Sequence, residues 1–377
     1  MTLQVPVRLL QAAHISVKPV VLATVASSTA VFTATPFLLR PIADEFDVTV
    51  GAAGWVSTAQ LAGFVLASWS AGRFLRPVRW VFLTFAFIGL LANLSSAFAP
   101  TLEWLAVARC ASGISLGLAA WFAWQDAFGN QEKTGDVAVV GPLVGVVLPP
   151  LITALLAGAG FEALFIAMAI VSATPLLFTG QVPRVDRLRP HRTRHASTRG
   201  AKAMLLALSF VTLGGSSVFV YAAAIGTEYN DLSPFAVSLG FSANALVAIP
   251  AAKWSGHRGS AGVWFVGTAT LALIMPSVHV PAVFLTALVV WGGFFFMGVP
   301  AAFTLLASRS NFPEERAGDA QAVMALGRVF GPLLGGAFLA SGHTTQMGIA
   351  ASAMMLCAAI LMLYVDRDRF AVHRADA

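Results

Sequence analysis

The chain alternates between long apolar stretches and short polar segments. A helix needs about 20 apolar residues to cross a bilayer, and twelve stretches approach that length. They lie at about 17–39, 51–71, 80–99, 102–124, 137–157, 161–179, 203–225, 234–252, 261–277, 282–306, 319–341 and 345–365. The pattern predicts an all-α polytopic membrane protein with twelve transmembrane helices. The opening segment lacks the apolar core and cleavage site of a signal peptide, so we expect the first helix to stay attached.

The longest polar stretch lies between the sixth and seventh predicted helices and is basic. It divides the chain into a six-helix bundle at 1–180, a cytoplasmic basic linker at 181–202 and a second six-helix bundle at 203–377. A sparse repeat, offset by 183 or 184 positions, relates the halves. Glu132, Lys133, Gly135, Asp136 and Pro149 recur as Glu315, Arg316, Gly318, Asp319 and Pro332, and Gly72 and Trp80 recur as Gly256 and Trp264. Two halves related by an axis along the membrane normal are typical of transporters.

The placement of Lys and Arg predicts the orientation of the helices. If the N-terminus is cytoplasmic, all but three of the 23 basic residues fall on the cytoplasmic side. Of the exceptions, Arg40 lies outside, and Arg109 and Arg328 lie within the predicted helices at 102–124 and 319–341. Because basic loops stay in the cytoplasm, we expect both termini there and a multi-pass protein of the bacterial inner membrane.

Composition agrees with a membrane protein and argues against two other classes. Hydrophobic residues make up 58% of the chain, charged residues only 11%, and the mean hydropathy is +0.79, which leaves no room for a soluble catalytic domain. The net charge of +6 does not indicate a nucleic-acid partner, because the basic residues are spread over short loops that set topology. Cys110 and Cys357 lie in apolar stretches, which argues against a disulfide framework.

Two predicted helices carry glycine motifs. The stretch at 102–124 contains Arg109-Cys-Ala-Ser-Gly113-Ile-Ser-Leu-Gly117. The stretch at 319–341 is entered through Phe312-Pro-Glu-Glu-Arg-Ala-Gly-Asp319 and contains Gly327-Arg-Val-Phe-Gly331-Pro332-Leu-Leu-Gly335-Gly336. Together with the two halves and the basic linker, these motifs resemble those of the major facilitator superfamily over nearly the whole chain. The resemblance implies two pseudo-symmetric six-helix bundles that move a solute by alternating access.

The segment after the second predicted helix departs from the family pattern of Gly, Asp-Arg and Gly-Arg. Here it has Ser68, Gly72-Arg73 and Leu75-Arg76, without the acid, and the second half has Gly256-His257-Arg258. The resemblance implies that charged residues near these loops take part in cytoplasmic gating: Arg73, Arg76, Arg258, Asp136 and Asp319. A partial match to an exporter motif, Gly141-Pro142, gives a slight preference for efflux.

Charged side chains inside the membrane are candidates for function, because each costs about 2.5 to 3.5 kcal/mol to insert. Arg109 and Arg328 are of this kind, one in each half, whereas all 17 acidic residues and the seven histidines can be placed in loops or near helix ends. This disfavours proton-driven export of cations and favours an anionic solute held by bidentate hydrogen bonds. Two alternatives remain open: Arg109 as a fold element bonded to backbone carbonyls, and Arg328 as a structural pairing residue.

Polar and aromatic residues near the bilayer centre complete the candidate site. The amides of Gln60 and Asn244 need partners in lipid, which are either the solute with its water or a neighbouring helix. Threonines such as Thr33 often bond to their own backbone, and tryptophans either wall a solute or pack against helices and lipid. The predicted substrate-binding residues are Arg109, Arg328, Gln60, Asn244, Tyr221, Trp291, Thr33 and Trp121.

The sequence therefore predicts a secondary active or facilitative transporter of a small neutral or anionic amphipathic organic solute, with export slightly favoured. We expect no enzyme activity, cofactor or metal, because neither a phosphate-binding loop nor a zinc motif occurs. The expected partners are a small-molecule solute and the lipid bilayer, with the protein a monomer. Uptake or exchange of a small organic anion, such as a carboxylate, is the alternative; a polytopic membrane enzyme and a non-transporting receptor or scaffold are more remote. Proton coupling would have to use an acid at a helix end, or be absent.

Overall fold

The computed structural model describes residues 17–127, 131–182, 196–254 and 258–375, and over these residues it is all-helical, as predicted. The elements are α1 (Pro19–Glu45), α2 (Val50–Phe74), α3 (Arg79–Ala97), α4 (Leu102–Ala127), α5 (Gln131–Ala173), the 3-10 helix η2 (Thr174–Gln181), α6 (Arg199–Phe219), α7 (Ala222–Glu228), α8 (Pro234–Ala252), α9 (Ala261–Ser277), α10 (Pro281–Ser308), α11 (Pro313–Ala340) and α12 (Thr344–Ala375).

Helix starts follow from local chemistry. Side chains cap several of them: the Thr49 hydroxyl accepts from the Ala52 amide at 3.1 Å at the start of α2, and Thr198 caps α6 in the same way. Prolines occupy the first positions of α1, α8, α10 and α11, where the missing N–H costs no hydrogen bond. The polar segments between apolar stretches thus contain the start signals that the hydrophobic pattern alone cannot supply.

The helices account for the predicted spans. Ten helical stretches of the described chain are long and apolar enough to cross a membrane, and Ala261–Ser277 is a shorter apolar helix. One of the ten, 139–181, turns at Gly160, whose φ of 79° suits glycine. The predicted helices at 137–157 and 161–179 are therefore the two arms of one element. The predicted helix at 203–225 is α6 continued by α7 after a turn at 220–221.

Two ends of the molecule can be defined by the connections between helices. We call the end where residues 182 and 196 flank the basic segment the linker end; most of the predicted linker itself, 183–195, lies outside the described residues. The opposite end, with the α1–α2 connection and Gly160, is the far end. Gln181 accepts a hydrogen bond from the amide of Val20 at 3.0 Å, and Arg79 donates to the carbonyl of Val182 at 3.1 Å. These bonds bring the end of η2 back to the starts of α1 and α3.

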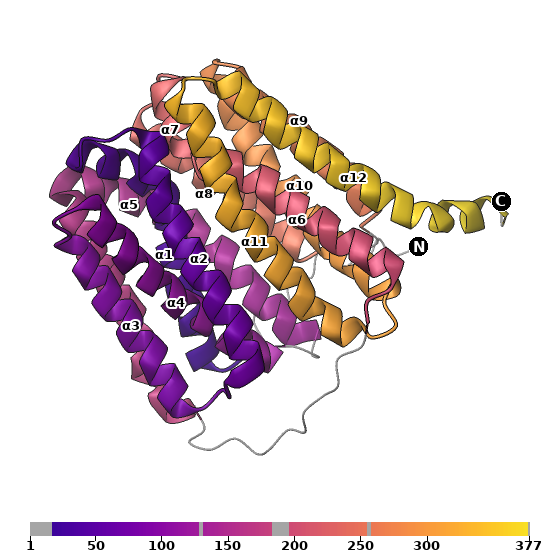
Figure 1. Ribbon diagram of the computed structural model, residues 1–377, viewed down its shortest axis with the longest axis horizontal. Coiled ribbons are helices and arrows are strands. Elements are labelled where there is room, and N and C mark those ends of the chain that lie inside the picture. Colours follow the sequence, from indigo (N-terminus) through magenta and orange to yellow (C-terminus); the bar gives the residue numbers. More distant parts are fainter. Residues whose placement is uncertain (1–16, 128–130, 183–195, 255–257, 376–377) are drawn as a thin grey trace, which may run out of the picture.

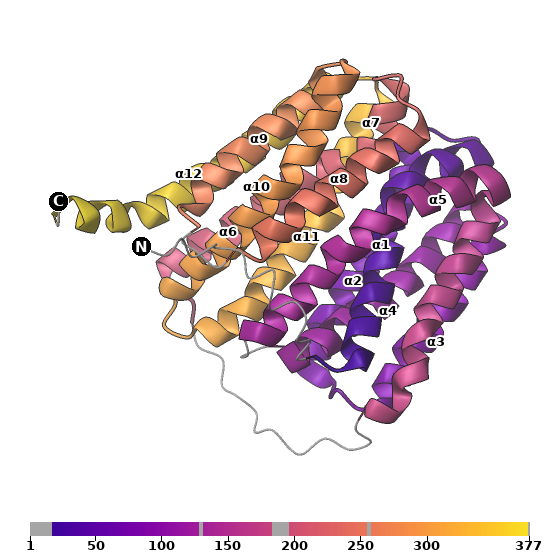
Figure 2. The same ribbon diagram turned by 180° about the vertical axis from the view of Figure 1, so that it is seen from behind.

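The helices form two groups that lie side by side (Figures 1 and 2). In the first group α4 packs against α2 and α3, and α5 packs against α1 and α3; in the second, α6 packs against α11 and α12, and α10 packs against α8 and α9. The groups meet through α2 with α11, α5 with α8, and α1 with α7. Three pairs of helices therefore form the junction at which a solute path between the groups would lie.

Glycines permit the closest helix contacts within each group. A Cβ built on Gly113 of α4 would collide with the backbone oxygen of Gln60 in α2, and one on Gly292 of α10 would collide with that of Asn244 in α8. Gln60 and Asn244 are 184 positions apart, which is the offset of the sequence repeat. The two groups therefore use the same close contact at equivalent places, with an amide residue opposite a glycine.

Candidate functional site at the junction of the two helix groups

At the far end, α2 and α11 approach each other through glycines. A Cβ built on Gly51 would collide with the backbone oxygen of Gly336, and one on Gly336 would lie 2.7 Å from the backbone oxygen of Gly51. Tyr221, at the turn between α6 and α7, is fully buried and donates its hydroxyl to the carbonyl of Pro332 in α11 at 2.7 Å. Its ring occupies the space that a side chain on Gly54 of α2 would need. Tyr221 therefore contacts both groups.

A row of aromatic rings, which we call the aromatic layer, crosses the same junction. Phe37 of α1 lies 5.0 Å from Phe241 of α8, measured between ring centroids. Phe241 lies 5.3 Å from Phe219 of α6, and Phe219 lies 5.8 Å from Trp291 of α10. Three of the four rings are less than a tenth exposed. The layer joins the two groups, and it fills this part of the junction with apolar surface.

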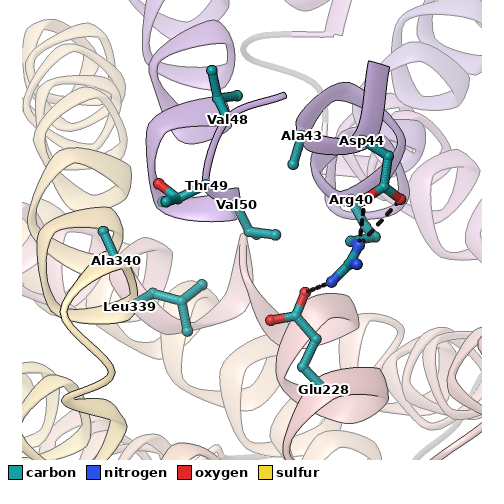
Figure 3. Close-up of a pocket in the computed structure, with 10 residues that line it drawn as sticks. Arg40, Ala43, Asp44, Val48, Thr49, Val50, Glu228, Leu339 and Ala340 are labelled. Atoms are coloured by element: carbon teal, nitrogen blue, oxygen red, sulfur yellow. Dashed lines mark hydrogen bonds and ion pairs between the residues drawn. The ribbon is translucent and has the colours of Figure 1, made fainter. Parts of the chain in front are cut away.

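An ion pair joins the groups at the surface of the far end. Arg40 of α1 bonds Asp44 of its own helix at 2.9 Å and Glu228 of α7 at 2.7 Å. Figure 3 shows Arg40 between the two carboxylates, at the edge of a pocket of about 280 Å³ that Leu339 and Ala340 of α11 also line. Because Arg40 is 56% exposed, this pair contributes little by itself, but it adds to the contacts that close the far end.

The orientation of Arg328 follows from its neighbours on α11. Gly327 faces Ser209 and Thr212 of α6, and Gly336 faces α2. Successive residues turn by about 100°, so Arg328 points between these two directions. On the opposite side of α11, Phe330 is 57% exposed, as expected for a lipid-facing position. Arg328 is therefore directed toward the junction and away from the lipid.

Arg328 lies at the depth of the aromatic layer and has no partner of its own. It is twelve residues before the end of α11, about 18 Å below the far end, and Trp291 is ten residues into α10, about 15 Å below it. Within the part of the chain that the structure describes, Arg328 makes no hydrogen bond or ion pair, and none of its side-chain nitrogens is fully buried without a partner. The residue is partly exposed. A cation that can bind a ligand therefore lies at the same depth as the aromatic layer.

Comparison with known proteins matches this architecture. The family model of the Major Facilitator Superfamily matches residues 20–326. The chain belongs to the major facilitator superfamily. Among solved structures, a bacterial homologue of the human lysosomal transporter Spinster, in an inward-facing and occupied conformation, aligns with a TM-score of 0.70 at 12% identity, covering 92% of this chain and 95% of that one. A point mutant of the nucleoside transporter NupG aligns with a TM-score of 0.66 at 12% identity, covering 92% and 98%. Comparison with curated proteins finds no match.

Membership in the superfamily confirms several expectations from the sequence. The chain is a multi-pass membrane transporter of the major facilitator superfamily and is not an enzyme. At 12% identity, the two solved structures establish the shared fold only. The solute has to be inferred from this transporter's own side chains.

Arg109 and Arg328 have different surroundings. Arg109 is 1% exposed, donates to the side-chain oxygen of Asn93 in α3, and lies with its guanidinium carbon 5.3 Å from the ring centroid of Phe165 in α5. Asn93 in turn donates to Gly89 and Ser172. The side chain of Arg109 thus joins three helices of the first group, and its contacts match the alternative of a fold element, bonded to an amide side chain instead of backbone carbonyls.

The other predicted residues are divided between the junction and the interiors of the groups. Asn244 donates to the carbonyl of Leu288 in α10 at 2.6 Å, and Gln60 is 3% exposed with its amide nitrogen unpartnered. The hydroxyl of Thr33 donates to the carbonyl of Thr29 in its own helix. Trp121 belongs to a second apolar cluster that excludes Trp291. Of the predicted substrate-binding residues, Tyr221 lies at the far-end contact of α2 with α11. Trp291 and Arg328 lie deeper, about 15 and 18 Å below the far end.

The predicted gating residues near the linker end have distinct partners. Lys253, directly after α8, lies 3.5 Å from Asp136 of α5, and this ion pair joins the two groups. Asp319 pairs with Arg316 of its own helix at 2.6 Å. Arg76 is exposed, and the side chain of Arg73 lies outside the described residues.

Arg258 binds within its own group. Its guanidinium donates to the carbonyls of Ala251, Ala252 and Trp254 at the end of α8 and to that of Phe296 in α10. Burial lowers the pKa of this guanidinium below its ordinary value. Arg258 therefore holds the end of α8 against α10 in this conformation and does not join the two groups.

Sequence reasoning did not find the phenylalanines of the aromatic layer, the partner of Arg40 or Lys253. Phe37, Phe219 and Phe241 look like ordinary apolar residues of spanning helices. Arg40 carried a signal, because it was the one basic residue expected on the outer side, and an isolated charge there suggests a specific acidic partner. The signal at Lys253 was weaker: the sequence shows only a cation directly after the apolar stretch that forms α8.

Proposed function

We propose that this chain is a secondary transporter that moves a small amphipathic organic solute, neutral or anionic, across the bacterial inner membrane by alternating access. In this proposal the linker end and both termini are cytoplasmic, because the basic residues cluster there, and the protein works as a monomer. The far end then faces outward, and the structure represents a state closed on that side.

One observation carries the proposal. The aromatic layer closes the far side of the junction, and the unpartnered cation Arg328 lies at the depth of Trp291 within it. An apolar wall with a few convergent polar groups is the usual composition of a small-molecule site. A solute bound here would contact both groups, so a rocking motion of one group against the other would change which side it can reach.

The arrangement also limits which residues belong to the proposed site. We assign Arg328, Trp291 and Tyr221 to it, with Thr33, Gln60 and Asn244 as residues that shape the helices around it. Arg109 and Trp121 are left out, because their contacts lie within the first group. Export is the favoured direction because α11 carries the Gly331-Pro332 motif and α5 a partial one; uptake or exchange of an organic anion is the second candidate, favoured by Arg328.

Solute flux tests the proposal. Purified protein would be screened by thermal shift against a library of metabolites and drugs, and stabilising compounds would be assayed for flux in proteoliposomes. We expect at least one compound to be transported, and Trp291→Ala to lower its flux by about tenfold, since truncating a buried aromatic ligand contact costs about 1.5 kcal/mol or more. Trp104→Ala is the matched control, because Trp104 is 55% exposed at the far end of α4. Stabilising compounds without flux would indicate a binding protein instead.

A further inference from the structure

We propose that Arg328 binds the anionic group of the solute, and that occupation of Arg328 by an anion is what lets the transporter change sides. The inference rests on the proposed function, because it names the solute class and the cycle of that same site. It predicts a carrier of organic anions with an apolar body that exchanges them much faster than it returns empty.

Among the described residues, Arg328 has no acidic partner. The nearest acid along α11 is Asp319, nine residues toward the linker end, about 14 Å away along the axis, and it pairs with Arg316. At the far end, Asp44 and Glu228 both bind Arg40. None of the acidic side chains that the structure describes on α2, α6 or α11 reaches the guanidinium of Arg328.

Arg109 and Arg328 differ in exposure and in their contacts. Both arginines lie deep in spanning helices. Arg109 is 1% exposed, donates through one nitrogen to Asn93, lies near Phe165 and keeps its Nη2 buried without a partner. Arg328 is partly exposed and makes no hydrogen bond or ion pair among the described residues. A guanidinium presents paired donors that match a carboxylate bidentately. The ligand that completes Arg328 is therefore an anion, and a neutral solute would leave its charge uncompensated.

Aromatic rings at a depth similar to that of Arg328 indicate the rest of the solute. Phe219 and Trp291, with ring centroids 5.8 Å apart, lie within about one helical turn of the depth of Arg328. Rings at this distance favour flat apolar groups. The solute class is thus an aryl or alkyl carboxylate, with the carboxylate on Arg328 and the apolar body against the aromatic layer.

The charge of Arg328 also affects the transport cycle. Alternating access closes the site on both sides for a moment, and a bare guanidinium enclosed there is a buried charge without a partner, which is unfavourable. A bound carboxylate removes that penalty through a hydrogen-bonded pair. The loaded transporter therefore changes sides faster than the empty one, which makes exchange of one anion for another the fast reaction.

Binding is tested first, on purified full-length protein. The probes are benzoate, phenylacetate, indole-3-acetate and octanoate, each compared with the neutral amide of the same skeleton. Wild type should bind at least one carboxylate about tenfold or more tightly than its amide, the contribution of a charged hydrogen-bonded pair. Arg328→Gln should lose this preference, Arg328→Lys should keep part of it, and Arg199→Gln is the control, since Arg199 is exposed at the start of α6.

Exchange is tested next, in proteoliposomes loaded with the carboxylate that wild type prefers. Efflux into buffer with the same carboxylate should exceed efflux into buffer without it by about tenfold or more, and Arg328→Gln should abolish this difference. A wild type without preference for any carboxylate over its amide, or an Arg328→Gln variant that keeps the preference, overturns the inference. Transport of amides or other neutral compounds by wild type would then leave the proposed function standing, whereas no flux of any compound would remove both.

Discussion

The contact between α2 and α11 at the far end provides a sharp test of how this transporter is held closed. A Cβ on Gly336 would lie 2.5 Å from the hydroxyl oxygen of Tyr221 and 2.7 Å from the backbone oxygen of Gly51, whereas ordinary contact begins at 3.4 Å. In Gly336→Ala the helices must therefore separate by roughly 1 Å, and in Gly336→Leu by more. We expect both variants to shift the transporter toward the state open at the far end.

The magnitude follows from the energy of overpacking, which is about 1 to 3 kcal/mol. If that energy is released when the far end opens, the ratio of open to closed molecules rises by about 5- to 150-fold. Ser217, one turn before Tyr221, is 1% exposed. Ser217→Cys, in a background with Cys110→Ser and Cys357→Ser, therefore reports opening through its reaction with a membrane-impermeant maleimide added on the far side.

The control is Gly158→Leu. Gly158 lies near the far end of α5, and a Cβ there would meet nothing within 4 Å. We expect Gly336→Leu to raise the labelling rate at position 217 about fivefold or more, Gly336→Ala to raise it less, and Gly158→Leu to leave it unchanged. A Gly336→Leu protein that remains monodisperse but labels at the wild-type rate would refute the argument that this glycine contact holds the far end closed.

Three further variants test the contacts around the junction. Tyr221→Phe removes one buried hydrogen bond to α11 within the second group, worth about 1 kcal/mol, but keeps the ring against Gly54 of α2. We therefore expect a lower melting temperature with little change in labelling at position 217, and a rise in labelling of about fivefold would contradict this assignment. Lys253→Gln breaks the partly buried ion pair with α5 and should raise maleimide labelling of a cysteine placed at Ala248, on the linker side, while labelling at position 217 stays the same or falls. Asn93→Leu leaves Arg109 buried without its partner and should cost about 3 to 5 kcal/mol of stability, measured as a lower melting temperature by size-exclusion after heating. Replacing Arg109 by Met in the same protein should restore most of this stability. An Asn93→Leu variant as stable as wild type would contradict the structural role of Arg109.

Much of the fold could be predicted because membrane insertion acts on local sequence. A run of about 20 apolar residues is a helix in lipid whatever lies beside it, since its backbone groups have no other partner. The twelve spans and the superfamily therefore followed from the chain alone. The double span at 137–179 was also found, because Gly160 turns the chain between its two arms.

The candidate site was predicted only in part. Intramembrane charge drew attention to both Arg109 and Arg328, because the sequence shows that each lies in a spanning segment but not where its side chain points. Helix rotation decides that: one arginine is turned toward Asn93, and the other toward the junction. Gln60 and Asn244 were recognised as amides that need partners, but their place in the packing of α2 with α4 and of α8 with α10 depends on glycines in other helices.

The same distinction holds for the whole molecule. The spans, the start signals of their helices and the two-half repeat are local or periodic properties, and hydrophobicity with charge placement specifies them. The Phe37–Phe241 contact of the aromatic layer, the Tyr221 bond to Pro332 and the ion pairs Arg40–Glu228 and Lys253–Asp136 each join residues more than 100 positions apart. Such contacts arise only when distant helices pack, because rotation and depth of each helix are set by its neighbours and not by its own composition.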